Sequence, residues 1–587
     1  MHARRLFRHG SVLLLGLALF GCTSTPPHPS EPASVTTPPT DSVVKPDIVA
    51  PPPTAAPATA EVALQQTEAA KGRREQQALP RERAEDHRKM AAPVGGAMAT
   101  LMAPVAPPPM EQRPMPSYVQ GNESYAPSQE NPFVSVHNHA LSTFSIDVDT
   151  ASYSNVRRLI TSGKLPPVGA VRIEEMVNYF SYDYPEPKQE PFAISTELGP
   201  CPWEGGHQLV RIGLKAKDLD KASLPPSNLI FLVDVSGSMN QANKLPLLKK
   251  SMLMLVDQMT DQDRIGIVVY AGSDRVVLPP TPGSRRQEIV AAIDSLSPGG
   301  STHASRGIIT AYQLAEQSFM PKGNNRVILA SDGDFNVGVT SRDELKRLIE
   351  DKRKSGVYLT VLGFGMGNYH DDTMEILADA GNGNYAYIDS LLEAKKVLIK
   401  ERGSNLFAQA NDVKIQVEFN PAQVGAFRLI GYENRMLADE DFKNDAKDAG
   451  EVGPGQRVTA LYELIPAGAA AVPAVDELKY QKVQPRGDAA GEVLTVKIRY
   501  KPLGQNSSVE QRHSLPAGAR ELARTSDDFR FAAAVAGFGM LLKQSEHKGQ
   551  AGYPLLLELA RQAKGKDDDG YRAEFIKLLE TSELLTR

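Results

Sequence analysis

The sequence predicts an α/β protein whose central element is a doubly wound, mostly parallel sheet. Two observations lead to this prediction. Between residues 227 and 402, short apolar segments alternate with longer segments of helical periodicity. The apolar segments are continuous, as in Leu229-Ile230-Phe231-Leu232-Val233, and strands covered by helices on both faces have this pattern. A binding site is therefore expected at the carboxyl ends of these strands.

Composition limits the classes of protein that the chain can belong to. Its 587 residues are too many for one ordinary domain, and 41% hydrophobic with 23% charged residues is typical of a globular chain. A net charge of −5 provides no basic field for nucleic acid. Two cysteines exclude a disulfide framework and a cysteine-based zinc site.

The first 21 residues have the pattern of a signal peptide. Arg4, Arg5 and Arg8 precede an uncharged, Leu-rich run over residues 10–21, which is too short to span a bilayer. The run ends in Leu19-Phe20-Gly21-Cys22, which resembles the bacterial lipobox. This resemblance implies cleavage before Cys22 and lipidation of its sulfur. Thr at position 23, rather than Asp, implies by similarity to Gram-negative lipoproteins an outer-membrane anchor with the protein facing the periplasm.

Residues 22–130 are predicted to be a disordered, Pro-rich tether. Nearly half of the 44 prolines lie here, together with Ser, Thr and Ala and few aromatic residues. Such a segment cannot bury enough apolar surface to offset the loss of chain entropy on folding.

Residues 131–226 are predicted to form an α+β segment, in which folded sequence begins near residue 132. The expected elements are strands at 142–147, 192–198 and 208–214 and helices at 155–162 and 172–179.

The predicted α/β domain covers residues 227–402. Its expected strands are 229–233, 264–270, 275–278, 326–330, 357–362 and 385–388, and its expected helices are 245–259, 286–296, 303–319, 342–355 and 371–380.

Residues 403–587 are predicted to form a C-terminal domain of strands followed by helices. The expected strands are 413–418, 424–429, 457–464 and 493–500, and the expected helices are 528–544, 553–562 and 570–584. The strands at 192–214 and 413–500 lie on either side of the α/β domain in the sequence. We hypothesise that they pair into one β-rich domain into which the α/β domain is inserted.

Oxygen-bearing side chains follow the predicted strands in a recurring arrangement. Asp234, Ser236 and Ser238 form a D-x-S-x-S pattern after one strand, Thr302 precedes a helix, and Asp332 follows another strand. Two carboxylates and three hydroxyls are hard oxygen ligands that suit Mg²⁺, or Mn²⁺ or Ca²⁺. Because two Asp only just neutralise a divalent ion, an ion bound mainly by hydroxyls would attract a further anionic oxygen from outside.

With these motifs, the sequence resembles the von Willebrand factor type A family over about residues 227–402. In that family, the positions of Asp234, Ser236, Ser238, Thr302 and Asp332 form the metal-ion-dependent adhesion site, which implies a protein ligand offering an Asp or Glu carboxylate. The flanking segments resemble a bacterial subfamily of type A lipoproteins, which extends the resemblance to residues 131–587. The segments that carry the resemblance are 147–153, 172–180, 229–239, 300–302, 332–333, 363–365 and 381–387.

The resulting hypothesis is a non-enzymatic, lipid-anchored envelope protein that binds a protein partner through a divalent metal ion. One alternative is a structural or regulatory subunit of an envelope complex, in which the metal site is incidental. Another is a hydrolase that uses the flanking domains, because Asp147-Val148-Asp149-Thr150 fits a phosphatase D-x-D-x-[TV] pattern, although capping or ion-pairing Asp residues also produce it. The chain contains no Walker A, G-x-S-x-G or H-E-x-x-H motif, which argues against a nucleotide ligand and against two large hydrolase classes.

Overall fold

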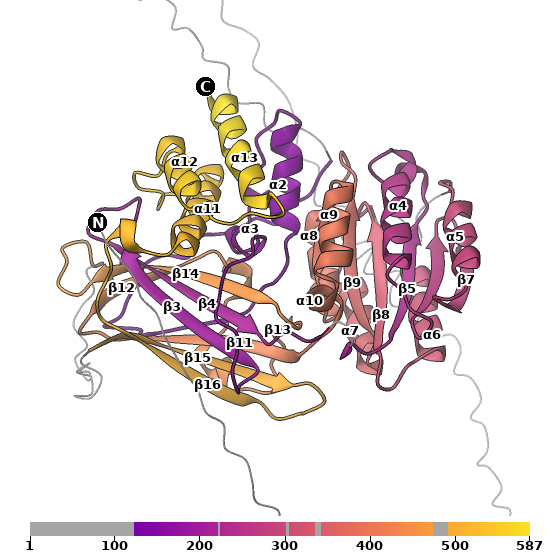
Figure 1. The fold of residues 1–587 in the computed structure, drawn as a ribbon, viewed down its shortest axis with the longest axis horizontal. Helices are drawn as coiled ribbons and strands as arrows, with labels where there is room; N and C mark the ends of the chain where they lie inside the picture. Colours follow the sequence, from indigo (N-terminus) through magenta and orange to yellow (C-terminus); the bar gives the residue numbers. More distant parts are fainter. Residues whose placement is uncertain (1–121, 221–222, 301–303, 335–341, 474–490) are drawn as a thin grey trace, which may run out of the picture. The chain divides into compact units, whose positions relative to one another are not determined.

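The computed structural model describes residues 122–587 except 221–222, 301–303, 335–341 and 474–490 (Figure 1). The predicted signal peptide, Cys22 and the tether up to residue 121 lie outside the described residues, as does Thr302. Among the helices that the structure describes, none is both long and apolar enough to cross a bilayer.

The α/β domain contains a six-stranded sheet with the order β10-β9-β8-β5-β6-β7. Every neighbouring pair is parallel except β6 and β7, which are antiparallel. This arrangement confirms the predicted mostly parallel sheet. Its strands are β5 (Ser227–Asp234), β6 (Arg264–Tyr270), β7 (Asp274–Pro282), β8 (Asn324–Ser331), β9 (Tyr358–Phe364) and β10 (Tyr385–Ile388).

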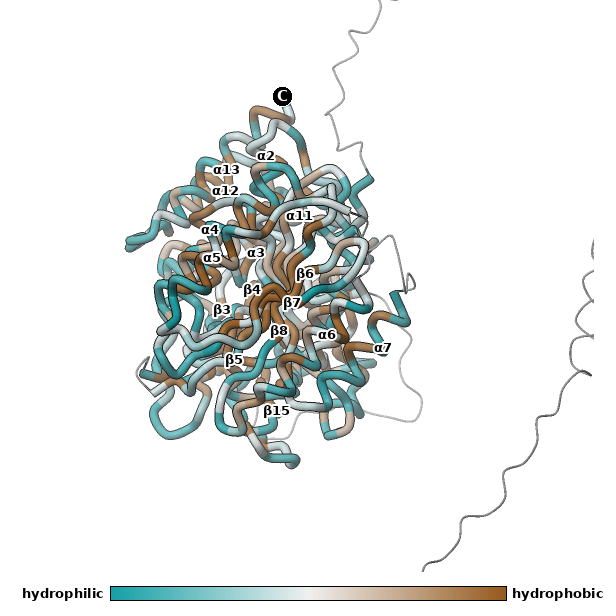
Figure 2. Tube along the Cα trace, turned by 90° about the vertical axis from the view of Figure 1, so that its right-hand side faces the viewer, coloured by the Kyte–Doolittle hydropathy of each residue, from teal (hydrophilic) through white to brown (hydrophobic). Residues whose placement is uncertain are grey.

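Helices cover both faces of this sheet because its strands are apolar on both sides. Leu229, Phe231 and Val233 pack with α4 (Leu245–Val256), α5 (Arg286–Ser295) and α9 (Leu391–Lys395). Ile230 and Leu232 pack with α6 (Ala304–Gln317), α7 (Arg342–Lys352) and α8 (Asp371–Ala380) on the opposite face. After α9 the chain continues through a π-helix, Lys396–Lys400, and α10, Arg402–Leu406. Figure 2 shows hydrophobic chain in the central strands, β6 and β8 among them, and hydrophilic chain at the periphery.

The segments on either side of the α/β domain build two further sheets, which share one hydrophobic core. One has the order β1-β12-β14-β4-β3, and the other contains β13, β11, β15 and β16, with β2 also paired to β11. The strands are β1 (Val134–Ser135), β2 (Leu141–Ser145), β3 (Phe192–Pro200), β4 (Gln208–Ala216), β11 (Ala410–Phe419), β12 (Val424–Ile430), β13 (Gly450–Val452), β14 (Arg457–Pro466), β15 (Glu492–Pro502) and β16 (Val509–Pro516).

Strand pairing in these sheets confirms the insertion hypothesis. β4, from before the α/β domain, pairs antiparallel with β14 from after it, with Val210 opposite Tyr462. In the second sheet, β2 pairs antiparallel with β11, with Phe144 opposite Ile415. β16 was not predicted because Val509–Pro516 lacks the apolar alternation of a half-buried strand and lies at a sheet edge.

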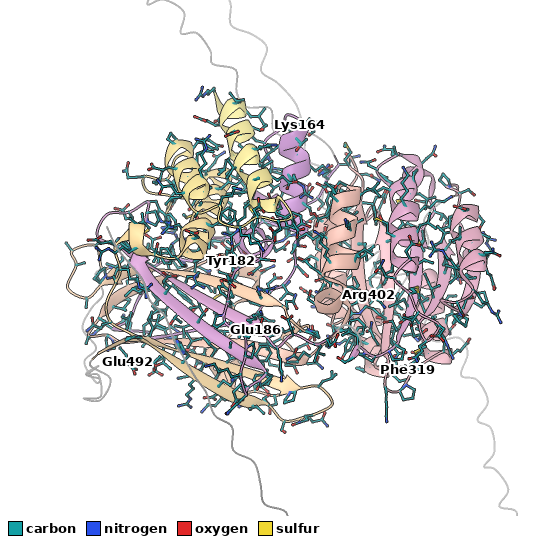
Figure 3. The ribbon with its side chains drawn as sticks, in the orientation of Figure 1. Lys164, Tyr182, Glu186, Phe319, Arg402 and Glu492 are labelled. Atoms are coloured by element: carbon teal, nitrogen blue, oxygen red, sulfur yellow. The ribbon has the colours of Figure 1, made fainter. Side chains whose placement is uncertain are left out.

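A helical layer packs against the outer face of the first of these sheets. Its interior includes Leu209 of β4, Leu461 of β14 and most of α11, so the apolar run at 531–542 belongs to a protein core. Figure 3 shows Tyr182 where this layer meets the sheet. The layer consists of α2 (Ala151–Thr161), α3 (Ile173–Asn178), α11 (Asp527–Lys543), α12 (Tyr553–Gln562) and α13 (Tyr571–Thr586).

The structure corrects the predicted C-terminal limit of the tether. Residues 122–130 belong to the folded part: Glu123 pairs with Arg158 at 3.0 Å, and the Ser124 N–H donates to the Tyr369 carbonyl at 2.8 Å. Ser128 Oγ accepts a hydrogen bond from Lys543 at 2.9 Å. Composition did not reveal this docking because it depends on ion pairs and backbone hydrogen bonds rather than on apolar side chains.

Buried ion pairs connect the flanking segments to α8. Arg435 pairs with Asp147 at 2.9 Å and Asp149 at 3.6 Å, and on α8 with Asp379 at 2.7 Å and Glu375 at 3.9 Å. Both Asp residues of the phosphatase-like pattern are therefore buried in ion pairs, as the ion-pairing interpretation of that pattern expected. Burial raises the pKa of Asp149, and raises that of Glu375 to about 7.

We predict that Arg435→Met lowers the free energy of unfolding by about 3–5 kcal/mol at pH 8, because it leaves buried carboxylates without their cation. The loss should be smaller at pH 5. Glu375 has a folded pKa of about 7 against an ordinary 4.5, so the folded chain binds more protons than the unfolded chain between these values. Stability therefore falls as pH rises through this window, and it falls more steeply when the arginine is missing.

Urea unfolding at both pH values measures this difference. Arg561→Met is the matched control, since Arg561 pairs with Glu580 in a largely exposed position. An equal loss of stability for the two variants, or a loss at Arg435 that does not change with pH, would contradict the interpretation.

Candidate metal site

Two neighbouring parallel strands bring the predicted carboxylates to the same edge of the sheet. β5 and β8 are paired with Val233 opposite Ala330, so that Asp234, the last residue of β5, and Asp332, directly after β8, both lie at carboxyl ends. Both residues are fully buried. The structure thus places these two carboxylates at one edge of the sheet.

Asp234 is held in one orientation by three donors. Its Oδ1 accepts from the Ser236 N–H at 2.9 Å, and its Oδ2 accepts from Ser331 Oγ at 3.0 Å and from the Tyr270 hydroxyl at 3.3 Å. Burial, together with the nearby charge of Asp332, raises the pKa of Asp234 to about 6. A positive charge at this edge would therefore stabilise the ionised carboxylates.

The loop after β5 presents the two predicted serines. The side-chain oxygens of Ser236 and Ser238 lie 3.0 Å apart. Ser238 is half-buried and Gly237 is exposed, so the loop opens toward solvent. The Gly237 N–H donates to the Gly300 carbonyl at 3.2 Å, and the Gly299 N–H donates to the Val235 carbonyl at 2.7 Å. These bonds hold the chain just before Thr302 against the serine loop, although Thr302 itself lies outside the described residues.

Sequence reasoning missed a lysine at this site. Lys244 is buried, and its Nζ donates to Asp332 Oδ2 at 2.8 Å and to Asn368 Oδ1 at 3.0 Å. Asn368, from the loop between β9 and α8, in turn donates to Asp334 Oδ2 at 3.2 Å. A usable signal was present, because Lys244 directly precedes the predicted helix at 245, where a positive charge opposes the helix dipole unless a carboxylate lies nearby.

The donor set fits a hard divalent cation. Two carboxylates and neutral hydroxyls are the ligands that Mg²⁺ prefers, and Asp334 Oδ1 is buried without a hydrogen-bond partner among the described residues. Within the part of the chain that the structure describes, no group of three or more His, Cys, Asp or Glu side chains is placed to hold a metal. A metal here would therefore be held by hydroxyls as much as by carboxylates.

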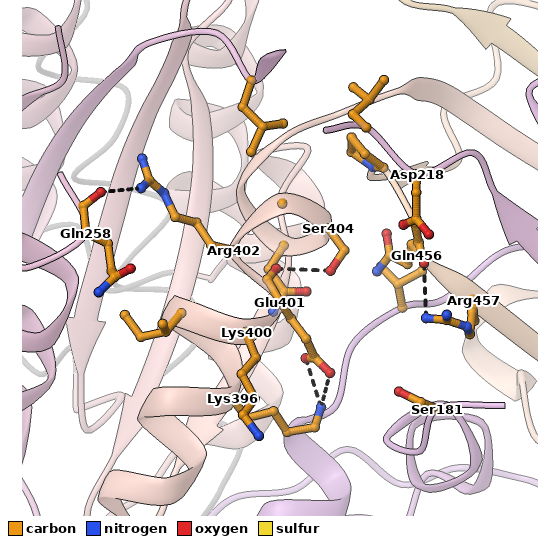
Figure 4. Close-up of a pocket in the computed structure, with 18 of the residues that line it drawn as sticks. Ser181, Asp218, Gln258, Lys396, Lys400, Glu401, Arg402, Ser404, Gln456 and Arg457 are labelled. Carbon is orange, nitrogen blue, oxygen red and sulfur yellow. Dashed lines mark hydrogen bonds and ion pairs between the residues drawn. The ribbon is translucent and has the colours of Figure 1, made fainter. Parts of the chain in front are cut away.

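A further cleft lies away from this edge. It has a volume of about 740 Å³ and is lined partly by the loop that precedes β6, at the amino end of the sheet (Figure 4). Its described lining contains no His or Cys. Lys396 is paired with Glu401 at 2.8 Å, and Arg402 with Asp263 at 3.5 Å. These two cations of the cleft are therefore neutralised by carboxylates of the chain.

This sheet order, with a D-x-S-x-S loop beside an Asp from the neighbouring strand, defines a von Willebrand factor type A domain. The family model of that name matches residues 228–400. A model described as von Willebrand factor matches residues 119–211, and one described as the C-terminal domain of the uncharacterized protein YfbK matches residues 404–585. The three matches correspond to the inserted domain and its two flanks.

Sequence identity to one relative defines the family more narrowly. The chain is 44% identical over 477 residues to the uncharacterized protein YfbK of Escherichia coli (strain K12), covering 79% of this chain and 82% of that protein. The chain therefore belongs to the YfbK family of bacterial proteins with a von Willebrand factor type A domain.

More distant similarities cover only part of the chain. The uncharacterized protein sll0103 of Synechocystis is 26% identical over 185 residues, which is 32% of this chain and 43% of that protein. Human inter-alpha-trypsin inhibitor heavy chain H3 is 27% identical over 28% of this chain and 19% of its own length. A solved von Willebrand factor type A structure from Catenulispora acidiphila is 15% identical, with a TM-score of 0.38, and covers 68% of this chain and 91% of that chain.

Proposed function

We propose that this protein is a lipid-anchored envelope protein that binds a protein partner through a divalent metal ion and catalyses no reaction. The observation that carries the proposal is the pair of buried carboxylates, Asp234 and Asp332, beside the open loop of Ser236 and Ser238. With Thr302, these residues would hold Mg²⁺, or Mn²⁺ or Ca²⁺. The ion would supply a positively charged coordination position that a partner's Asp or Glu carboxylate can fill.

The surroundings of the site support protein binding. Gly237 and Asn240 are exposed on the loop after β5, and Met366 is 43% exposed on the loop between β9 and α8. An apolar side chain near a charged centre allows a partner to add contact area to the metal–carboxylate bond.

The hydrolase alternative receives less support. Asp147 and Asp149 are engaged by Arg435, and Asp149 Oδ1 also accepts from the Tyr385 N–H at 2.8 Å. They follow β2 of the flanking sheet rather than a strand of the α/β sheet. These contacts support an interdomain structural role for the two carboxylates.

The anchor is the second part of the proposal. Cys22 would carry the lipid, and the Pro-rich segment that follows would separate the folded part from the outer membrane on its periplasmic side.

We predict that residues 23–587 retain a partner from envelope extract in Mg²⁺ but not in EDTA. The best variant is Ser236→Ala with Ser238→Ala, because it removes two expected metal ligands without leaving a charge unpaired. Asp332→Ala is less specific, since it would also strip Lys244 of its carboxylate. Ser295→Ala, at the exposed end of α5, is the matched control.

Quantitative mass spectrometry of the retained proteins measures the result. A protein retained only by the wild type and Ser295→Ala in Mg²⁺ is the expected outcome. Identical retained proteins with and without metal would contradict the proposal and favour a structural or regulatory subunit whose metal site is incidental.

We predict that Cys22→Ser abolishes incorporation of labelled palmitate in a Gram-negative host and moves the protein from the outer-membrane fraction to a soluble fraction. Cys201→Ser is the control, because Cys201 is buried in the folded part. Palmitate labelling that persists in Cys22→Ser would show that the anchor lies elsewhere.

A further inference from the structure

We infer that Lys244 is a built-in counter-cation that weakens metal binding by the site alone and makes the bound ion depend on an anionic ligand from outside. The inference rests on the proposed metal site and assigns a role to a residue that the metal-binding motif does not contain.

Lys244 is placed as firmly as the proposed ligands. It is 1% exposed, and its ammonium group is in hydrogen-bond contact with Asp332 and Asn368. Asn368 Nδ2 also lies 3.4 Å from Asp332 Oδ2, so lysine, amide and carboxylate form one closed cluster. Asp332 Oδ1 accepts from the Asp334 N–H at 3.2 Å. Both oxygens of Asp332 are therefore already engaged by donors of the chain.

The backbone around Lys244 is adapted to this position. Lys244 occupies the N-cap position of α4, where Ser, Thr, Asp or Asn is usual, and its side chain makes no capping hydrogen bond. Its aliphatic stem runs over Gly365, which has φ +85° and whose Cβ, if present, would overlap that stem. The usual preference for a capping residue is thus set aside in favour of the lysine, which is expected at a functional position.

The charge of the site follows from this geometry. Asp234 and Asp332 carry two negative charges, and Lys244 offsets one of them inside the protein. Without metal, the lysine stabilises the buried carboxylate pair. With a divalent ion, the three side chains and the ion carry a net positive charge, so repulsion between Lys244 and the ion weakens metal binding. A partner's carboxylate removes this excess charge.

Metal and carboxylate must then strengthen each other's binding, because coupling between two ligands is reciprocal. The site would bind metal weakly alone and firmly once a partner has supplied its carboxylate. A lysine with only a packing role predicts the opposite response to mutation, since damage to the site weakens metal binding.

The test is a calorimetric titration of residues 23–587 with MnCl₂ alone. Lys244→Met removes the charge, Lys244→Gln removes it but keeps a donor for Asp332, and Lys244→Arg keeps it. Lys250→Met is the matched control, because Lys250 lies exposed on the same helix. We expect Lys244→Met and Lys244→Gln to bind Mn²⁺ about tenfold more tightly than the wild type, Lys244→Arg and Lys250→Met.

Thermal unfolding provides the second readout. Metal-free Lys244→Met should melt below the wild type because Asp332 loses its cation, and saturating Mn²⁺ should close most of this gap. If Lys244→Met does not fold, Lys244→Gln decides the test. Unchanged or weaker Mn²⁺ affinity in the variants that lack the charge would overturn the inference while leaving the proposed function standing. No Mn²⁺ binding by any variant would contradict both.

Replacing chloride by acetate at equal ionic strength tests the coupling. Acetate should tighten Mn²⁺ binding by the wild type more than by Lys244→Gln. An equal effect of acetate on the two proteins would show that Lys244 does not couple metal binding to carboxylate binding.

Discussion

The site is organised around two like charges that the sheet forces together. β5 and β8 are neighbours in the centre of the sheet, and Asp234 and Asp332 end up buried at the same edge, where burial and the nearby charge of Asp332 raise the pKa of Asp234. A fold tolerates such a pair only if other groups offset the free energy cost of burying two carboxylates side by side. Hydrogen bonds from Ser331 and Tyr270 support one carboxylate, and the Lys244 ammonium supports the other.

The flanking segments are connected to this edge through one loop and one helix. The loop from Gly365 to His370 contains Asn368, which contacts Lys244, and leads directly into α8. Asp371, at the start of α8, pairs with Arg172, and the Ser124 N–H donates to Tyr369 within the loop. The segment that follows the proposed tether thus touches the loop that holds Asn368. Insertion into the flanking domain gives the edge that carries Asp234 and Asp332 neighbours that an isolated α/β domain would lack.

Sequence patterns located the two Asp residues because parallel strands place their carboxyl ends together, so strand position alone decides which side chains meet. Lys244 was missed because its partner Asp332 lies 88 residues further along the chain, and contacts between helix termini and distant loops leave no periodicity. The docking of residues 122–130 was missed for a related reason, since it depends on single polar contacts such as Glu123 with Arg158. Hydrophobic patterning predicts helices, strands and the positions where they end. Which individual charges pair with one another can be known only from the folded chain.

The most direct measurement of the central claim is the anomalous scattering of Mn²⁺ in crystals of residues 23–587. The account predicts one strong peak at the edge formed by β5 and β8, about 2 Å from the hydroxyl oxygens of Ser236 and Ser238. The absence of a peak at this edge, or a peak only among the buried carboxylates around Arg435, would contradict it.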